Sequence, residues 1–265
     1  MPILTQELSS LGSMQKYPDP LHFEGNTALL AMPKVAIVGT RKPLQYTRTL
    51  THRLASTLAK AGIAVVSGGA MGVDAIAHTG ATPKNTIVVL PCGIDLKYPA
   101  VNKTLLSEIE KEGLLLSQFE RGFRATPWSF VVRNELVVAL GEVLIVTEAE
   151  LQSGSMRSVA YAQKMQKEIF VLPHRIGESG GTNALLEEHK AEAIYDIERF
   201  VGMLSERFGI VAPKEAETKN SEDPFLAFCK TTPTYEEAMR LFASRVFEAE
   251  LGGEILVKEG RVFLA

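Results

Sequence analysis

Short apolar runs that alternate with helical stretches are the feature that most constrains the fold of this chain. Six runs are apolar at nearly every position: Val35–Val38, Ala64–Ser67, Thr86–Leu90, Leu114–Ser117, Val143–Thr147 and Ile169–Leu172. The stretches between them have helical patterns: Thr47–Lys60, Val73–Gly80, Lys103–Glu112, Ser129–Leu140, Met156–Gln166 and Asn183–His189. Strands without polar alternation are buried on both faces, which is typical of a parallel sheet. The alternation therefore predicts a doubly wound α/β domain with right-handed crossovers.

Turns rich in small residues follow several of these predicted strands. Gly39 ends the first apolar run, Ser67–Asp74 contains three glycines, and Ser153–Ser155 precedes a predicted helix. Turns of this kind leave backbone N–H groups free at helix N-termini, where anions bind. Ligands of doubly wound sheets lie beyond the carboxyl ends of the strands, where all these turns fall. The pattern predicts a surface for a ligand that carries more than one phosphate.

Two cations stand in the first of these turns. Arg41 and Lys42 follow Gly39, and a guanidinium there can hold a phosphate in bidentate fashion while backbone N–H groups bind its other oxygens. The alternative is that both are ordinary solvated cations. The adjacent glycine and the position at the ligand edge of the sheet favour phosphate binding.

The other two turns supply small and hydroxyl-bearing residues. One turn contains Ser67, Gly68 and Gly69, and its glycines allow close approach of a ligand. Asp74 lies near the start of the following helix, where we expect its carboxylate to cap the helix or orient a neighbouring group rather than to catalyse a reaction. Ser153, Gly154 and Ser155 open another helix. The two hydroxyls either cap that helix or bind phosphate.

The segment Trp128–Asn134 combines aromatic, cationic and amide side chains. Aromatic faces stack on unpaired bases and arginine binds phosphates, a pairing expected of a protein that binds single strands. A phenylalanine such as Phe130, taken on its own, is more often a core residue than a stacking platform. Arg133 and Asn134 lie three and four positions later, on the same helical face or its rim, and favour the binding interpretation.

Composition and missing motifs narrow the function further. The formal net charge of −3 argues against a protein that grips nucleic acid through global charge, although a local basic strip is compatible with it. Two separated cysteines, no apolar run long enough for a membrane span and no export signal predict a cytoplasmic protein. The sequence has no Walker-type loop, no dinucleotide fingerprint after the first strand, no metal-ligand spacing and no nucleophile elbow. We expect a binding site with no catalytic residues, no cofactor and no metal.

Changes in pattern predict the domain boundaries. Residues 1–34 are irregular and rich in turn formers, and we expect a lead-in that packs on a main domain of residues 35–208. Residues 209–223 are charged and poor in large apolar side chains, which indicates a linker. Residues 224–265 show three short helical patterns and a hairpin around Lys258–Gly260, an arrangement similar to a winged helix.

Several motifs in this order resemble the DNA-processing protein A family (DprA, also called Smf). The resemblance covers about Tyr17 to Asp196 and rests on Leu21–Asn26, Val35–Arg41, Ser67–Asp74, Pro91–Pro99, Phe130–Asn134, Glu148–Ser155, Val171–Pro173 and Gly181–Asn183. Each motif alone is modest evidence, but together in this order they are highly specific.

The resemblance implies an extended Rossmann-like domain that binds single-stranded DNA and forms a homodimer through that domain. It also implies that the protein protects incoming strands during natural transformation and hands them to RecA. By position, Arg41 would hold a backbone phosphate, and Gly68, Gly69 and the turn Ser153–Ser155 would offer backbone donors. Phe130 would stack a base, while Arg133 and Asn134 would hold the strand.

The chain departs from the family pattern in three places. Glu135 stands where a second arginine is usual, which bears on the positive charge of the binding pocket. His174 replaces a glycine that commonly follows Val-Pro. The helical N-terminal domain of many members is missing, so the sequence is similar to a short form of the family.

Two other functions compete with this interpretation. Related Rossmann-like enzymes cleave nucleoside monophosphates, but the glycine-rich segment and glutamate they share are replaced here by Thr147–Ser155, with only Glu148 and Glu150 left as carboxylates. A regulator of double-stranded DNA would act through residues 224–265, which are acidic for a protein that reads a groove. Docking to another protein suits that module better.

Overall fold

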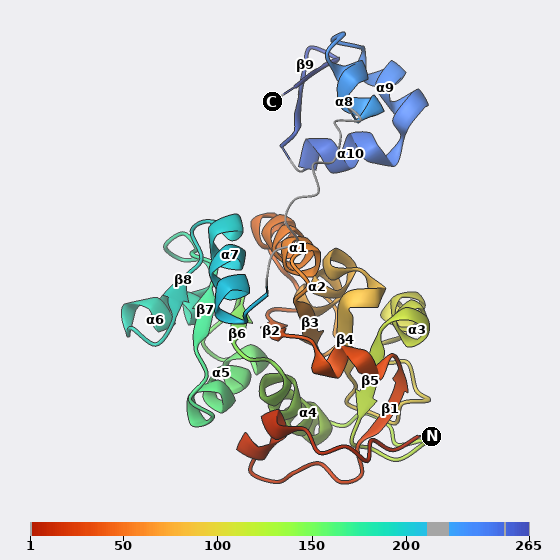
Figure 1. Cartoon of the computed structure of the whole chain (residues 1–265). Coiled ribbons are helices and arrows are strands. Elements are labelled where there is room, and N and C mark those ends of the chain that lie inside the picture. Colours follow the sequence, from red (N-terminus) through yellow and green to blue (C-terminus); the bar gives the residue numbers. More distant parts are fainter. Residues whose placement is uncertain (1, 211–222, 252, 265) are drawn as a thin grey trace. The chain divides into compact units, whose positions relative to one another are not determined.

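An eight-stranded sheet organises the first of two units in the computed structural model, which describes residues 2–210, 223–251 and 253–264 (Figure 1). The units comprise Met1–Ile210 and Val211–Ala265 and are described separately. The strands of the large sheet are β1 (His22–Gly25), β2 (Lys34–Val38), β3 (Ala64–Ser67), β4 (Thr86–Val89), β5 (Leu114–Ser117), β6 (Leu144–Val146), β7 (Ile169–Val171) and β8 (Glu192–Ala193).

The strand order is β1-β5-β4-β3-β2-β6-β7-β8. All neighbouring pairs are parallel except β1 with β5, which is antiparallel. The chain builds outward from β2 to β5, then returns to place β6 on the other side of β2. The predicted doubly wound, mostly parallel Rossmann-like sheet is therefore confirmed, and its topological switch point lies between β2 and β6.

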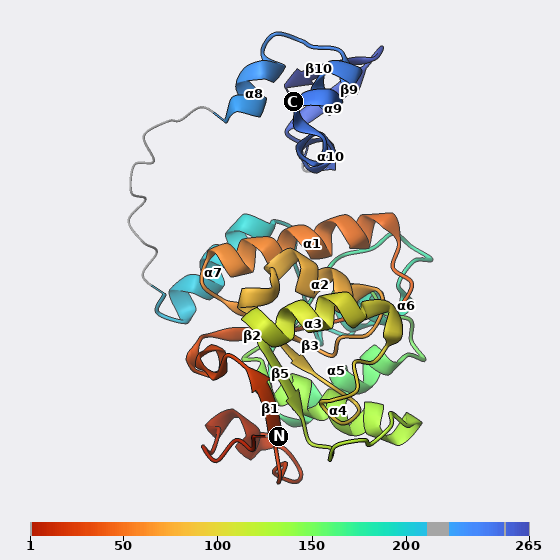
Figure 2. The ribbon, with the colours of Figure 1, turned by 90° about the vertical axis from the view of Figure 1, so that its right-hand side faces the viewer.

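Helices cover both faces of this sheet (Figure 2). They are α1 (Gln45–Lys60), α2 (Val73–Ala81), α3 (Lys103–Glu112), α4 (Pro127–Leu140), α5 (Gly154–Lys164), α6 (Gly180–Glu187) and α7 (Ile197–Arg207), with short 3-10 turns at Ser9–Ser13, Thr27–Ala31, Pro83–Asn85 and Ala100–Asn102. Helices α1, α2, α3 and α7 pack on one face, and α4, α5 and α6 pack on the other together with the N-terminal segment.

The central strands have no polar face because both faces are covered. Every residue of β2, β3, β4 and β5 is buried. Their side chains point alternately into the core layers on the two sides of the sheet. Complete burial of one such aliphatic side chain stabilises the fold by about 1.5–3 kcal/mol. This explains why the strand positions were predictable from apolar runs alone.

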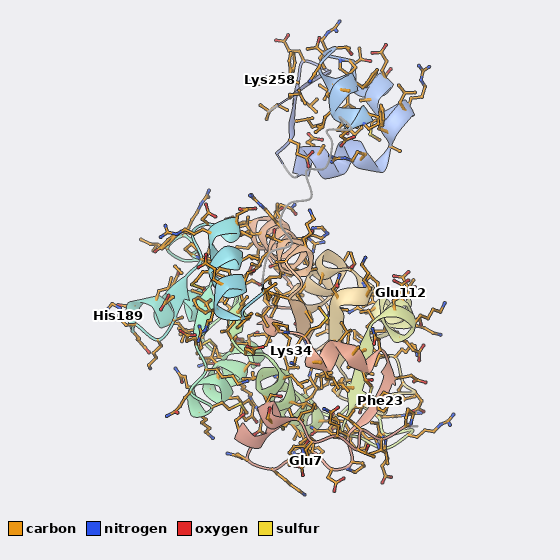
Figure 3. The ribbon with its side chains drawn as sticks, viewed as in Figure 1. Glu7, Phe23, Lys34, Glu112, His189 and Lys258 are labelled. Carbon is orange, nitrogen blue, oxygen red and sulfur yellow. The ribbon has the colours of Figure 1, made fainter. Side chains whose placement is uncertain are left out.

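Helix α4 is buried on all sides over its second half, from Leu136 to Leu140, because it lies between the sheet and the N-terminal segment. Lysine ammonium groups bind backbone carbonyls at the end of α4 and at the end of the 3-10 turn Thr27–Ala31. The Lys167 Nζ donates to the carbonyls of Val138 and Ala139 at 2.9 and 2.7 Å, and also to Gly141. Lys34, labelled in Figure 3, donates in the same way to Leu30 and Met32. These bonds satisfy carbonyl groups that a helix C-terminus otherwise leaves unpaired.

Several parts of the first unit differ from the sequence-based prediction, and the two-residue strand β8 is one that was not predicted. The strand β1 lies inside the region expected to be irregular, because only four residues pair with β5 and such a short edge strand has little pattern. The helix α7 was not predicted, although Ile197, Phe200, Val201 and Leu204 form a buried stripe. The Asp196 carboxylate accepts the Arg199 N–H at 2.8 Å and caps this helix. Helices α5 and α6 each begin earlier than predicted, at a glycine.

The second unit contains α8 (Pro224–Cys229), α9 (Tyr235–Phe242) and α10 (Ser244–Leu251), followed by the antiparallel pair β9 (Ile255–Lys258) and β10 (Arg261–Leu264). A small apolar core unites them, and Arg245 binds Asp223 at 3.0 Å and Glu254 at 2.6 Å. The winged-helix assignment remains a prediction. Most of the predicted linker, residues 211–222, lies outside the described residues.

Candidate functional site

A cavity of about 1240 Å³ opens beside the carboxyl ends of β2 and β3, at the topological switch point of the sheet. Its walls come from the loop after β2, the turn after β3, the N-terminal half of α4 and the start of α5. Doubly wound sheets bind their ligands at this place because the connections diverge to opposite faces and leave a crevice.

The cavity brings together most of the residues singled out in the sequence. Those that line it are Gly39, Arg41, Lys42, Gly68, Phe130, Arg133, Asn134, Ser153, Gly154 and Ser155. Ser67 and Gly69 do not line it. The Ser67 hydroxyl donates to the Ile37 carbonyl at 2.6 Å and ties β3 to β2. A side chain at Gly69 would point at Val88 and Leu106 in the core.

Phe130 stands among charged and aromatic neighbours on the cavity wall. The guanidinium carbons of Arg41 and Arg133 lie 5.3 and 5.8 Å from its ring centroid, and the Tyr98 ring contacts it edge-on at 5.9 Å. The Phe130 side chain is half-buried. These contacts are within the range of cation–π and edge-to-face attraction. The ring is thus held at the edge of the cavity rather than in the apolar core.

Arg133 lies deeper than its neighbour Arg41. The residue is only 4% exposed, and its Nη1 donates to the Val89 carbonyl at 3.3 Å and lies 3.9 Å from the Asp74 Oδ2. Asp74 also accepts the Ala70 N–H at 3.2 Å. Burial raises the pKa of the Asp74 carboxyl, which the positive charge of Arg133 partly opposes. Asp74 therefore orients Arg133 and the turn after β3, as its position near a helix start suggested.

Gly68 leaves the space that Arg133 occupies. A Cβ atom added to Gly68 would stand 1.2 Å from the Arg133 Nη1. The glycine is therefore required by a close approach of the guanidinium to the backbone and not by a left-handed conformation, since its φ lies outside that region.

The start of α5 offers hydrogen-bond donors to the cavity. Ser153 is the N-cap residue but makes no capping hydrogen bond, and its buried Oγ has no partner in the described part of the chain. The first N–H groups of α5 are therefore not satisfied by the side chain that usually does so. Three exposed cations line the same cavity: Arg41, Lys42 and Arg157. The arrangement suits an anion and favours phosphate binding over capping for Ser153.

Glu148 and Glu135 are buried carboxylates close to this site, and both bind backbone N–H groups. The Glu148 Oε2 accepts the Leu44 N–H at 2.9 Å, which fixes the loop that carries Arg41. The Glu135 Oε1 accepts the Gln15 N–H at 2.9 Å and so faces the N-terminal segment. Glu135 is not among the residues that line the cavity. The carboxylate in place of the usual arginine thus adds no negative charge to the cavity wall.

Tyr98 and Arg157 line the cavity but were not proposed as site residues from the sequence. Tyr98 lies in the segment Pro91–Pro99, which contributed to the family resemblance without a role for its side chain. Arg157 comes three residues after Gly154, in the first turn of a helix already expected to bind anions. This position in the first turn of α5 could have identified Arg157 as a site residue from the sequence.

The fold and this cavity define a class of Rossmann-like proteins with a crevice at the switch point that is lined by cations and an aromatic ring. Residues 6–205 match the family described as DNA recombination-mediator protein A. The chain belongs to that family, also called DprA or Smf.

Individual relatives differ in how much of their length this chain covers. It is 37% identical to protein Smf of Synechocystis over 54% of this chain and 36% of the relative. It is 36% identical to a putative DNA processing protein DprA of Mycobacterium tuberculosis, over 66% of this chain and 46% of the relative. The chain thus spans less than half the length of these two curated relatives.

Two solved structures have the same fold. DNA processing protein A from Helicobacter pylori, studied for its single-stranded DNA binding mode, is 44% identical with a TM-score of 0.76, over 78% of this chain and 96% of that chain. DprA from Streptococcus pneumoniae is 30% identical with a TM-score of 0.69, over 74% of this chain and 70% of that one. No helix in the described part of this chain is long and apolar enough to cross a membrane.

Proposed function

We propose that this protein binds single-stranded DNA in the cavity beside β2 and β3, without catalytic turnover. The observation that carries the proposal is the Phe130 ring with two guanidinium groups within 6 Å of its centroid, and the uncapped start of α5 in the same cavity. A ring of this kind can stack on a base of any sequence while cations and N–H groups bind the phosphates. The relative from Helicobacter pylori supports this ligand.

Each residue has a role in this proposal. Arg41 and Lys42 are exposed and contact backbone phosphates, and Phe130 stacks on a base. Arg133 acts as a cation at the cavity floor, partly neutralised by Asp74. Hydrogen bonds from Asn134, the turn Ser153–Ser155 and the backbone near Gly39 and Gly68 hold the strand.

The wider role that we propose is suggested by family membership. As a mediator of DNA recombination, the protein would protect incoming strands during natural transformation in the cytoplasm and help to load RecA on them. It would act as a homodimer through the first unit. A nucleotide-cleaving enzyme is less favoured, because the Glu148 carboxylate is bound to the Leu44 N–H. The second unit would serve in docking.

Fluorescence anisotropy of labelled oligo-dT, compared with duplex of equal length at two salt concentrations, tests the proposal. We expect preference for the single strand and weaker binding at higher salt. Arg41→Ala should weaken binding and reduce the salt dependence, because it removes a phosphate contact. Arg48→Ala removes an exposed arginine of α1 that does not line the cavity, and serves as the matched control.

Phe130→Ala should cost about 1–3 kcal/mol of binding free energy if the ring stacks on a base. Thermal unfolding of the same variant separates this from a structural effect. A lower melting temperature with unchanged affinity of the folded protein would make Phe130 a packing residue. Preference for duplex, or no binding to either ligand, would contradict the proposed function.

A further inference from the structure

Trp128 is an exposed aromatic residue just outside the cavity. It is the only tryptophan of the chain and is 61% exposed. Its ring contacts Phe119 edge-on at 5.9 Å, and Phe119 in turn stacks on Phe123 at 4.6 Å with the two planes 9° apart. The Trp128 ring therefore rests on Phe119, which is itself stacked on Phe123, while most of the Trp128 surface remains in water.

The helix start that carries Trp128 is rigid. The Thr126 Oγ1 accepts the Ser129 N–H at 3.2 Å, and the Ser129 Oγ accepts the Thr126 N–H at 2.9 Å. Pro127 occupies the first turn of α4, where its fixed φ is already helical. A backbone fixed in this way, with the Trp128 ring resting on Phe119, reduces the conformational entropy lost when a ligand stacks on that ring.

Trp128 continues directly from the cavity wall. Ala125, Thr126 and Pro127 line the cavity, and Trp128 is the next residue. Two residues along a helix are about 200° apart, so Trp128 and Phe130 lie on opposite sides of α4. A strand that leaves the cavity over Ala125–Pro127 therefore reaches the side of the helix on which Trp128 stands.

The loop that leads into α4 and to Trp128 carries positive and negative side chains in nearly equal number. Arg121 is exposed and lies 3.8 Å from the Asp95 Oδ2, while the exposed Arg124 has no ion-pair partner within the described residues. Glu120 on the same loop is also exposed. Arg124 makes the loop compatible with a polyanion. The near balance means that stacking rather than charge must supply most of the attraction.

We propose that Trp128 is a second stacking platform, which binds a base of single-stranded DNA where the strand leaves the cavity. The inference rests on the proposed function of the cavity and extends the binding site to the outer side of α4. The inference has two testable consequences. The contribution of Trp128 appears only with strands longer than the cavity, and it is largely independent of salt because no phosphate contact is involved.

Native tryptophan fluorescence gives a direct test, since the signal comes from Trp128 alone. Oligo-dT of about 4 and about 16 nucleotides spans the range of single-strand site sizes. We expect the longer strand to quench the emission and the shorter one to leave it nearly unchanged. Trp128→Ala should weaken binding of the longer strand about 5- to 150-fold with little change in the salt slope. Affinity for the short strand should stay near that of the wild type.

Matched variants make the result interpretable. Trp128→Phe keeps a ring against Phe119 and should retain most of the long-strand affinity. Tyr195→Ala removes another exposed ring, 85% exposed and outside the cavity lining, and should have no effect. Unchanged long-strand binding by Trp128→Ala, beside weakened binding by Phe130→Ala, would overturn this inference alone. Wild-type protein that binds neither strand would overturn the proposed function and the inference together.

Discussion

Gly68→Ala should displace the guanidinium of Arg133, and the size of the effect follows from the geometry. The new methyl carbon would stand 1.2 Å from Nη1, 2.2 Å from Cζ and 2.8 Å from Nη2. Side-chain ends can often move away from such a clash. Here the guanidinium is buried, donates to the Val89 carbonyl and faces Asp74. Its departure would leave the buried carboxylate without a cation.

Two energetic costs determine how far Gly68→Ala lowers the free energy of unfolding. Overpacking a filled site usually costs about 1–3 kcal/mol. Loss of one partner from a buried ion pair costs about 3–5 kcal/mol. The second figure is an upper bound, because Arg133 can move into the open cavity and Asp74, whose pKa is already raised by burial, can take up a proton. We expect Gly68→Ala to lower the free energy of unfolding by about 1–3 kcal/mol and to weaken DNA binding as the contact with Phe130 is lost.

Urea denaturation and oligo-dT anisotropy on the same preparations measure both effects. Gly154→Ala is the matched control. That glycine also lines the cavity, its φ is not positive, and an added Cβ would meet no atom within 4 Å. The control should change stability by less than about 0.5 kcal/mol. If Gly68→Ala unfolds at the same urea concentration as Gly154→Ala, the packing argument for Arg133 is refuted.

Two predictions concern stability alone. Burial, together with the charge of Arg133, lowers the pKa of His78 to about 3. Below pH 6.5 the unfolded chain therefore binds more protons than the folded protein, and the free energy of unfolding should fall by about 2 kcal/mol from pH 7 to pH 5. Urea titrations at each pH measure this slope, and His78→Asn should flatten it. Lys167→Met should lower the free energy of unfolding by about 1–3 kcal/mol at pH 7, because it leaves the carbonyls at the end of α4 without their donor. Lys164→Met, at an exposed position of α5, should leave the unfolding midpoint unchanged.

The fold was predictable where burial imposes one pattern on every residue of an element. The strands β2 to β7 are apolar at nearly every position because helices cover both faces of the sheet, so composition marks them without an alignment. The strand β1 is paired on one side only and four residues long, which leaves too little pattern to recognise. Helix α7 carries a clear buried stripe and an aspartate cap, so its sequence signal was present but not used.

The candidate site was predictable at the level of segments rather than side-chain directions. Glycine turns at strand ends had to meet at one edge of a parallel sheet, which is why Arg41, Phe130 and Ser153 share a cavity. Sequence could not reveal that Ser67 and Gly69 do not line that cavity, since neighbouring residues of one turn point in different directions. Nor could it reveal that Asp74 pairs with Arg133, because that contact joins α2 to α4 across the sheet edge.

The antiparallel strand β1 has a consequence for how the protein behaves at high concentration. Strand β5 is buried at every position, and β1 occupies its outer hydrogen-bonding edge. A bridge between Ile3 and His22 extends this cover, and the opposite edge, β8, has only two residues. Proteolytic removal of the first 25 residues would uncover the largely apolar strand β5, and an exposed apolar edge is one on which further strands assemble. We therefore expect the trimmed protein to aggregate through intermolecular β-pairing, which the N-terminal segment prevents in the intact protein.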